Sequence, residues 1–281
     1  MHITGIGIIC SNLENGGQTI NTSEKPVVSI ITACLNSERD IEQTIQSVID
    51  QTYPNIEYVI IDGGSTDKTV DIIKKYEGHI AKWISEPDRG VYDAMNKGIA
   101  HSTGDILYFL NSGDHLYNNK VIEIVVNNFL SGSVVGVYGN VEVISKHKKT
   151  VRGCKVTYNN LLYRRVCHQA LFVRRSLFDE FGHFSTEFKF SADHEFVVKS
   201  IKGYPDGFLY VDEVIATYRD GGMSCKMMER TKIDDLKILS SNYNMVRFLF
   251  GAAVCAFVIL KYKIPQILQL KSAHIDRENL Q

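Results

Sequence analysis

Three carboxylates stand where a carboxylate could take part in chemistry: Asp62, Asp114 and Asp193. Asp62 begins D-G-G-S-T-D after one apolar stretch, and Asp114 ends N-S-G-D after another. A carboxylate in such a place can accept a hydrogen bond from a base N–H or a hydroxyl, or hold a divalent cation that bridges two phosphates. Asp193, within S-A-D-H-E, could act as a general base that takes the proton of a hydroxyl. The three runs therefore indicate ligand binding and proton transfer.

Each run also has a plainer interpretation. D-G-G-S-T-D could be an ordinary strand-to-helix turn, and Asn, Ser, Gly and Asp are favoured turn residues in any case. Asp193 and Glu195 would lie in the first turn of a helix, where acidic side chains stabilise the helix dipole. Taken one at a time, the runs leave both interpretations open.

Other polar residues are compatible with the same two views. His168 and Gln169 precede an apolar strand and could bind a hydroxyl-rich substrate or satisfy buried backbone groups. Arg89, in E-P-D-R-G, could reach a phosphate or pair with Asp88. No Ser-His-Asp nucleophile elbow or Walker loop is recognisable, and no G-x-G-x-x-G follows the first strand.

Apolar periodicity predicts the elements that position these residues. Strands are expected at 27–34, 56–62, 80–85 and 105–111, and helices between them, the last over 91–100. Asn36 or Ser37 is expected to cap the first helix, and Ser65 or Thr66 the second. This alternation is typical of a parallel sheet with right-handed crossovers, whose ligands bind beyond the carboxyl ends of the strands. Beyond it we expect a helix at 121–129, strands within 134–144 and a helix at 192–203.

The chain is expected to form one catalytic domain, residues 26–223, preceded by a poorly ordered lead-in (1–25) and followed by a helical tail (224–281). In the tail, the run 248–260 lacks polar side chains and is flanked by Arg247, Lys261 and Lys263. As a helix it would be ~20 Å long, too short for the ~30 Å hydrocarbon core of a bilayer. It could be a buried core helix or an interfacial segment that contacts a membrane surface, and its place near the chain end favours the membrane.

Composition excludes some classes of function. The formal net charge of −1 gives no global attraction to nucleic acid or anionic lipid. The six cysteines show neither a disulfide framework nor a metal-binding spacing, and no secretory signal is recognisable, so a cytoplasmic location is expected.

Together the runs resemble those of the family 2 inverting glycosyltransferases, which have the GT-A fold. The matching blocks are P-V-V-S-I-I-T-A-C-L-N-S-E, S-V-I-D-Q-T-Y-P-N-I-E-Y-V-I-I-D-G-G-S-T-D-K-T, D-R-G-V-Y-D-A-M-N-K-G, G-D-I-L-Y-F-L-N-S-G-D and, more faintly, H-Q-A-L-F and S-A-D-H-E. They span about residues 26–222. The resemblance implies an α/β fold of GT-A type, with a Rossmann-like, mostly parallel central sheet flanked by helices.

The resemblance also implies a nucleotide-sugar donor, foremost a UDP-sugar, and the residues that would bind it. Asp114 would hold Mn²⁺ or Mg²⁺ and so neutralise the leaving diphosphate. The residues implied for the donor are Thr32, Glu38 and Asp62 at the nucleoside, Arg89 near the diphosphate, and Asn111.

On the acceptor side, the resemblance makes Asp193 the base that deprotonates a hydroxyl of a cell-surface glycan or lipid-linked acceptor, at the cytoplasmic face of the membrane. His168, Gln169 and Glu195 would contact the acceptor or support the base. A single displacement at the anomeric carbon would then invert its configuration.

Two features depart from the family pattern. Asn111 and Gly113 stand where many relatives carry acidic residues, and Ala192 replaces the glutamate that precedes the base. These departures keep a second hypothesis open, a sugar-nucleotide or glycan-binding protein without catalysis. A sugar nucleotidyltransferase is the third, although the loop T-A-C-L-N-S-E has neither the glycines nor the cations that a triphosphate needs.

Overall fold

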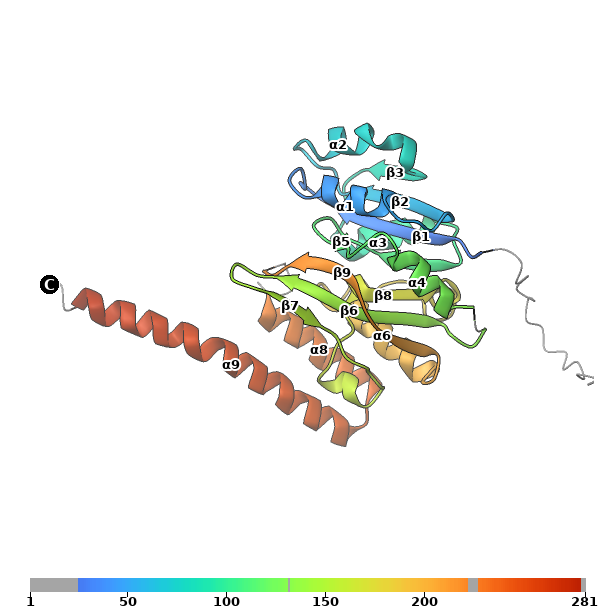
Figure 1. The fold of residues 1–281 in the computed structure, drawn as a ribbon. Helices are drawn as coiled ribbons and strands as arrows, with labels where there is room; N and C mark the ends of the chain where they lie inside the picture. The colour runs from blue at the N-terminus through green and yellow to red at the C-terminus, as the bar shows by residue number, and fades with distance from the viewer. Residues whose placement is uncertain (1–24, 131, 222–226, 279–281) are drawn as a thin grey trace, which may run out of the picture.

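A nine-stranded mixed sheet runs through the protein, and helices cover both of its faces (Figure 1). The computed structural model describes residues 25–130, 132–221 and 227–278, so the expected lead-in lies almost wholly outside the described residues. The strands are β1 (Val28–Cys34), β2 (Ile56–Asp62), β3 (Lys82–Ser85), β4 (Ile106–Phe109), β5 (His115–Leu116), β6 (Gly136–Ile144), β7 (Lys149–Arg152), β8 (Leu171–Arg174) and β9 (Phe208–Arg219). The helices are α1 (Ile41–Ile49), α2 (Thr69–Lys75), α3 (Val91–Ala100), α4 (Val121–Asn128), α5 (Ser176–Phe181), α6 (Ala192–Gly203), α8 (Met228–Asn242) and α9 (Met245–Glu278), with 3-10 turns at Glu77–His79, Asn160–Leu162 and His168–Ala170.

The first half of the sheet is parallel. Strands β3, β2, β1 and β4 lie side by side in that order, each parallel to its neighbours. All seven residues of β1 are buried, because helices cover both of its faces. In the register, Cys34 lies opposite Asp62 and Asp62 opposite Ser85, so the three strands end level with one another. The predicted alternation of strand and helix is confirmed here.

The second half of the sheet is mixed. Strand β8 is antiparallel to both β4 and β6, while β6 is parallel to β9. The regular alternation therefore stops after β4, as the sequence indicates. The turn His168–Ala170 leads directly into β8. Because β8 is the neighbour of β4, His168 comes to lie beside the exit of β4, more than fifty residues away in the chain.

Each face of the sheet carries its own hydrophobic core. Helices α1, α2 and α4 pack on one face, and α3, α5, α6 and α8 on the other. Aromatic rings fill the space beneath α6, where Phe178 stacks on Phe196 with ring centroids 4.1 Å apart. Phe184 meets both rings edge-on. This packing fixes α6, and with it the N-terminal turn that carries Asp193.

The two C-terminal helices continue the core. Ile238 and Leu239 of α8 are buried in the same cluster as Phe196. Helix α9 runs along the outside of α8 and extends beyond the body of the protein (Figure 1). None of the described helices is long and apolar enough to cross a membrane. The expected boundary at residue 223 lies outside the described residues, so the division into domain and tail stays a prediction.

Candidate active site

The loops after β1 and β2 are interlocked. Asn36 donates its backbone N–H to Ser65 Oγ (2.7 Å), and its side-chain Oδ1 accepts a hydrogen bond from the Thr66 N–H (2.9 Å). These side chains bridge the loops instead of capping helices, so the predicted caps were wrong. Helix α2 begins after Lys68 without a side-chain cap at that residue, and the carboxylate of Asp67 accepts the Thr69 N–H at 2.9 Å. The two loops behave as one rigid rim at the strand ends.

Asp62 lies inside this rim. Its side chain is fully buried, and Oδ2 accepts hydrogen bonds from the Ser65 N–H (2.9 Å) and Ser85 Oγ (2.6 Å). Its Oδ1 accepts from Ser65 Oγ. The carboxylate thus holds the loop in shape. Its implied contact with the nucleoside stays a prediction, and it requires one of these serines to release the carboxylate.

Thr32 and Glu38 differ sharply in accessibility. Thr32 is fully buried, and its hydroxyl donates to the Leu110 carbonyl (2.7 Å) across the sheet. A hydroxyl enclosed in this way cannot touch a ligand, so we assign Thr32 a structural role in place of the implied nucleoside contact. The one-residue alternation of a strand puts its side chain on the inner face. Glu38 is exposed on the rim, where its Oε2 accepts the Lys68 N–H at 3.2 Å.

Arg89 is exposed at the start of α3. Its side chain is 81% exposed, and its guanidinium pairs with Asp93 at 3.1 Å, one turn into α3. Its partner is therefore Asp93 and not Asp88, the residue that the sequence suggested. An exposed pair of this kind is worth little energy, so the guanidinium can leave Asp93 for a phosphate.

The exit of β4 presents Asp114. The Asp114 carbonyl accepts Thr44 Oγ1 at 2.8 Å, and the Gly113 N–H donates to the same Oγ1 at 3.1 Å, which ties this loop to α1. Gly113 has a φ of 97°, a left-handed conformation that favours glycine. The backbone therefore explains why no acidic side chain stands at this position.

Burial raises the pKa of Asp114 to about 6. The charge of His168 and a hydrogen bond from Gln169 act in the opposite direction without cancelling the effect of burial. A carboxylate removed from water in this way gains from a cation. Among the described residues, neither lysine nor arginine pairs with it.

His168 links the two halves of the site. Its Nδ1 lies 3.5 Å from Asp193 Oδ2, and its Nε2 lies 3.3 Å from the Asn111 side-chain amide. The neighbouring carboxylates Asp193 and Asp114 raise the pKa of His168 although burial opposes them. The Asn111 Oδ1 has no hydrogen-bond partner among the described residues. Rotating that amide would turn this oxygen toward a protonated His168.

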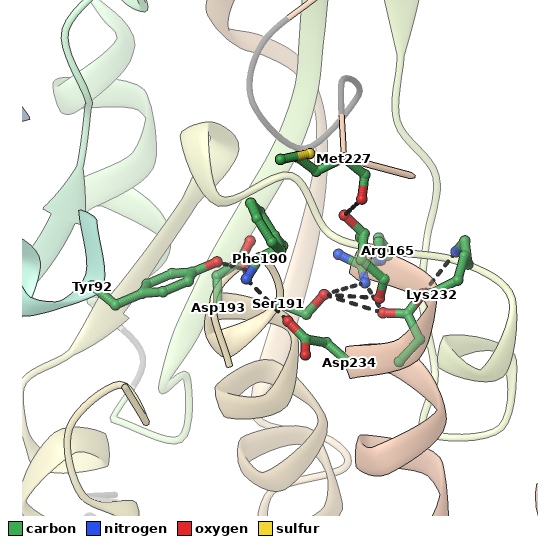
Figure 2. A network of polar contacts seen from close by, with 10 residues as sticks. Tyr92, Arg165, Phe190, Ser191, Asp193, Met227, Lys232 and Asp234 are labelled. Carbon is green, nitrogen blue, oxygen red and sulfur yellow. Dashed lines mark hydrogen bonds and ion pairs between the residues drawn. The ribbon is translucent and has the colours of Figure 1, made fainter. Parts of the chain in front are cut away.

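Asp193 lies at the N-terminus of α6, pointing toward α3 (Figure 2). Its Oδ1 accepts the hydroxyl of Tyr92 at 2.7 Å, and its side chain is 17% exposed. Burial would raise the pKa of Asp193, but the hydrogen bond and charge of His168, then Arg165 and Tyr92, together hold that pKa well below its usual range. Asp193 is therefore ionised, and part of its side chain stays exposed.

Sequence reasoning did not assign the residues that fix Asp193 in place. Tyr92 falls inside the block D-R-G-V-Y-D-A-M-N-K-G, so its position could have been noticed. Arg165 donates to Ser191 Oγ (2.9 Å) and pairs with Asp235 of α8, which also binds Lys232 at 2.7 Å (Figure 2). No spacing in the sequence connects residues 165, 191 and 235, since only the folded chain joins them.

Glu195 and Gln169 make contacts within the protein near the two carboxylates Asp193 and Asp114. Glu195 is buried and pairs with Lys199 one turn further along α6, so it faces away from the Asp193 carboxylate's partners. The Gln169 carbonyl accepts the Tyr108 hydroxyl at 2.8 Å. The side chain of Gln169 reaches Asp114. Neither arrangement contradicts a supporting role, and an acceptor contact for either residue stays a prediction.

The residues at the β4 exit fit a hard divalent cation with few protein ligands. The described residues contain no group of three or more His, Cys, Asp or Glu side chains that could hold a metal ion. Asp114 offers one buried carboxylate, and the unpartnered Asn111 Oδ1 is a further oxygen. Mg²⁺ and similar ions often bind through one or two carboxylates, with phosphate oxygens and water as the other ligands.

A family model and curated relatives match this chain. The model of glycosyl transferase family 2 matches residues 29–191. The PGL/p-HBAD biosynthesis glycosyltransferase of Mycobacterium bovis is 32% identical over 212 residues, covering 73% of this chain and 82% of the relative.

Solved structures show the same architecture. The structure of S. aureus TarS with UDP-GlcNAc has a TM-score of 0.63 at 18% identity, covering 81% of this chain and 70% of that one. The mannosyltransferase PcManGT of Pyrobaculum calidifontis, with GDP-Man and Mn²⁺, has a TM-score of 0.62 at 15% identity, covering 90% and 81%. The expected GT-A fold is thereby confirmed, and the chain belongs to glycosyl transferase family 2.

Proposed function

We propose that this glycosyltransferase moves a sugar from a UDP-sugar to a hydroxyl of a glycan or lipid-linked acceptor, with inversion at the anomeric carbon. One observation carries the proposal. His168 contacts Asp193 and lies within electrostatic reach of Asp114, so the acceptor base and the donor-side carboxylate share one site. Their separation in sequence makes an accidental turn or helix cap a poor explanation for both.

Asp193 is the base. It is ionised, and Tyr92 and His168 hold its two oxygens in a fixed direction. Its low pKa makes it a weak base toward a free alcohol. An alcohol that has begun to bond to an oxocarbenium-like carbon becomes strongly acidic, so a weak base suffices if proton transfer follows attack. Attack from the side opposite to the departing diphosphate inverts the sugar carbon.

Asp114, with a carbonyl oxygen such as that of Asn111, would hold Mn²⁺ or Mg²⁺ on the donor side. When bound, the ion neutralises charge that develops on the leaving diphosphate. Arg89 can swing from Asp93 to the same phosphates. Complexes of TarS with UDP-GlcNAc and of PcManGT with GDP-Man and Mn²⁺ support a nucleotide-sugar donor and a divalent cation as the ligands.

The rival hypotheses have less support. The departures that suggested a binding protein have conformational explanations, because Gly113 adopts a positive φ and Ala192 is completely buried. A nucleotidyltransferase would need glycines and several cations after β1 for a triphosphate, and the described loop there carries one cation, Arg39, beside the carboxylate of Glu38.

We also propose that α9 rests on the cytoplasmic surface of a membrane. Gly251 and Cys255 turn toward the core, whereas Leu249, Phe250, Phe257 and Leu260 are each more than half exposed. The apolar run thus has a buried face and an exposed apolar face, which combines the two alternatives that the sequence left open. Arg247 and Lys261 flank the exposed face, as interfacial helices require.

The enzymatic proposal is tested with Asp193→Asn and Asp114→Asn in the full-length chain. Asp193→Asn keeps the size of the side chain and should lower kcat by about 10²- to 10⁴-fold, the usual contribution of a general base, with UDP binding intact. Asp114→Asn should abolish the stimulation of UDP binding by Mn²⁺. Asp71→Asn, on the exposed side of α2, is the charge-matched control. Wild-type turnover in Asp193→Asn would exclude it as base, and NMR of the product would report the anomeric configuration.

A further inference from the structure

A cavity lined by three arginines lies beside the proposed catalytic centre. Its volume is about 240 Å³, and Arg152, Arg164 and Arg165 contribute to its wall together with Tyr138 and Cys167. Arg152 is the last residue of β7, whereas Arg164 and Arg165 belong to the segment that leads to His168. Arg165 supports the base through Ser191 and through its charge, whereas Arg152 and Arg164 have no role in the proposed reaction.

The cavity carries an excess of positive charge. Within the described residues no carboxylate pairs with Arg152 or Arg164. Arg165 does pair with Asp235, but Lys232 shares that carboxylate, so two cations face one anion (Figure 2). Arg165 also lowers the pKa of Lys232, after the larger effect of burial, which indicates that the cations are close enough to repel each other. An anion in the cavity would relieve that repulsion.

The cavity adjoins the base. Cys167 in its wall directly precedes His168, whose imidazole contacts Asp193. Burial raises the pKa of the Cys167 thiol to about 11. The charge of Asp193 raises this pKa further, whereas the charge of Arg152 lowers it. Arg165 is fixed by Ser191, two residues before Asp193. A molecule held by these arginines would therefore lie beside the segment whose His168 contacts the base.

The same segment connects the cavity to the exposed apolar face of α9. Tyr163, next to Arg164, is 53% exposed, and its ring lies 6.2 Å from that of Phe250 on α9. This segment thus carries cations that line the cavity and an exposed aromatic ring that contacts α9. A ligand with an anionic head and an apolar chain matches both surfaces.

We propose that the cavity lined by Arg152, Arg164 and Arg165 binds a phosphate group of the acceptor, so that the acceptor substrate is a phosphate-bearing glycan or lipid. The proposal rests on the proposed transferase function and names its substrate class. Phosphate is preferred over carboxylate because three guanidinium groups offer more donors than two carboxylate oxygens can accept. The donor diphosphate is placed elsewhere, at Asp114 beside the exit of β4.

Binding of decyl phosphate to the full-length protein tests the proposal without turnover. Calorimetry is run with UDP and Mn²⁺ at saturation, so that the donor site is closed to phosphate. Arg152→Gln and Arg164→Gln should each weaken binding at least about tenfold, the loss expected when a hydrogen bond between charged groups is removed. Both side chains lie at the surface, so both variants should fold. Lys146→Gln, an exposed lysine outside the cavity, is the matched control and should bind as the wild type does.

The outcomes separate this inference from the function on which it rests. Failure of decyl phosphate to bind, equal binding by both arginine variants, an equal loss in Lys146→Gln, or equally tight binding of decanoate would overturn the phosphate site. UDP binding and sugar transfer are measured separately, so none of these results would contradict the proposed transferase function. Inorganic phosphate in place of decyl phosphate identifies the source: weaker binding assigns the anion to a lipid, and equal binding to a water-soluble phosphate.

Discussion

At the scale of single residues, Asp114 and Asp193 are the same chemical group in opposite surroundings. Asp114 is largely shielded from water without a strong partner, and its pKa rises to about 6. Asp193 is also largely shielded, but His168, Arg165 and Tyr92 keep it ionised. Such a divergence commonly distinguishes groups with different roles in one active site. Here it separates a carboxylate that needs a cation from one that is ready to accept a proton.

Tyr92 is expected to position Asp193 through the 2.7 Å hydrogen bond from its hydroxyl. Tyr92→Phe removes only that donor and keeps the ring in its contact with Phe184. We expect kcat to fall about tenfold, the equivalent of one hydrogen bond to a charged group, while KM for the donor and Tm stay near the wild-type values. A loss of Tm with unchanged kcat would show a purely structural role.

Metal binding at Asp114 should depend on pH. The protonated acid, which dominates below about pH 6, cannot hold a cation. The stimulation of nucleotide binding by Mn²⁺ should therefore be lost as the pH falls through about 6. UDP-GlcNAc is the suitable probe, because its diphosphate lacks the monoester proton that also titrates near there. Equal stimulation by subsaturating Mn²⁺ at about pH 5 and pH 7.5 would contradict the assignment.

At the scale of elements, the site depends on how α6 and α8 are joined. Arg165 and Ser191 connect the segment before β8 and the start of α6 to Asp235 of α8. The aromatic stack beneath α6 holds the helix from the other side. Helix α8 is thus a structural support of the catalytic base, although it contributes no residue to the reaction.

Removal of the shared carboxylate should destabilise the protein. Asp235 is 5% exposed, and Asp235→Asn leaves Arg165 and Lys232 without an anion between them. We expect a loss of about 3 kcal/mol in the free energy of unfolding, as found when one partner of a buried pair is removed. Chemical denaturation measures it, with the exposed Asp71→Asn as control. Equal stability of the two variants would show that the network is dispensable.

At the scale of the whole molecule, the proposed catalytic cleft and the exposed apolar face of α9 belong to one body. The Tyr163 to Phe250 contact joins the segment beside the catalytic centre to α9. A membrane under α9 would hold the acceptor's apolar chain close to the cavity that receives its head. The enzyme would then meet its acceptor by diffusion in two dimensions.

Binding to anionic vesicles should require the exposed face of α9. Leu249→Glu combined with Phe257→Glu places two charges on side chains that are 60% and 67% exposed, so folding should be preserved. Each Leu or Phe that no longer enters the membrane costs about 2 kcal/mol of binding free energy. The affinity for vesicles, measured by co-sedimentation, should therefore fall well over tenfold. Ile233→Glu, at a 52% exposed position on α8, should bind vesicles normally. Unchanged sedimentation of the double variant would leave α9 as a contact for protein.

The sequence by itself determined the local order of the chain. Uninterrupted apolar runs and helical spacing predicted β1, β2, α3 and α6 to within a residue or so, because burial on both sides of a strand and on one side of a helix leaves a periodic trace. The carboxylates at strand and helix ends were recognisable for the same reason. The burial of Thr32 follows from the same pattern, because its apolar run indicates a strand covered on both faces, and the implied nucleoside contact did not take this into account.

Only the tertiary structure decided which of these residues meet. The antiparallel return of β8 beside β4 brings His168 to Asn111, and the packing of α6 brings Asp193 to His168. Tyr92, Arg165 and Asp235 join the site through contacts between residues seventy or more positions apart. Such contacts leave no periodic pattern in the sequence. A hydrogen bond or an ion pair forms between any two suitable groups that the fold brings together, whatever their separation along the chain.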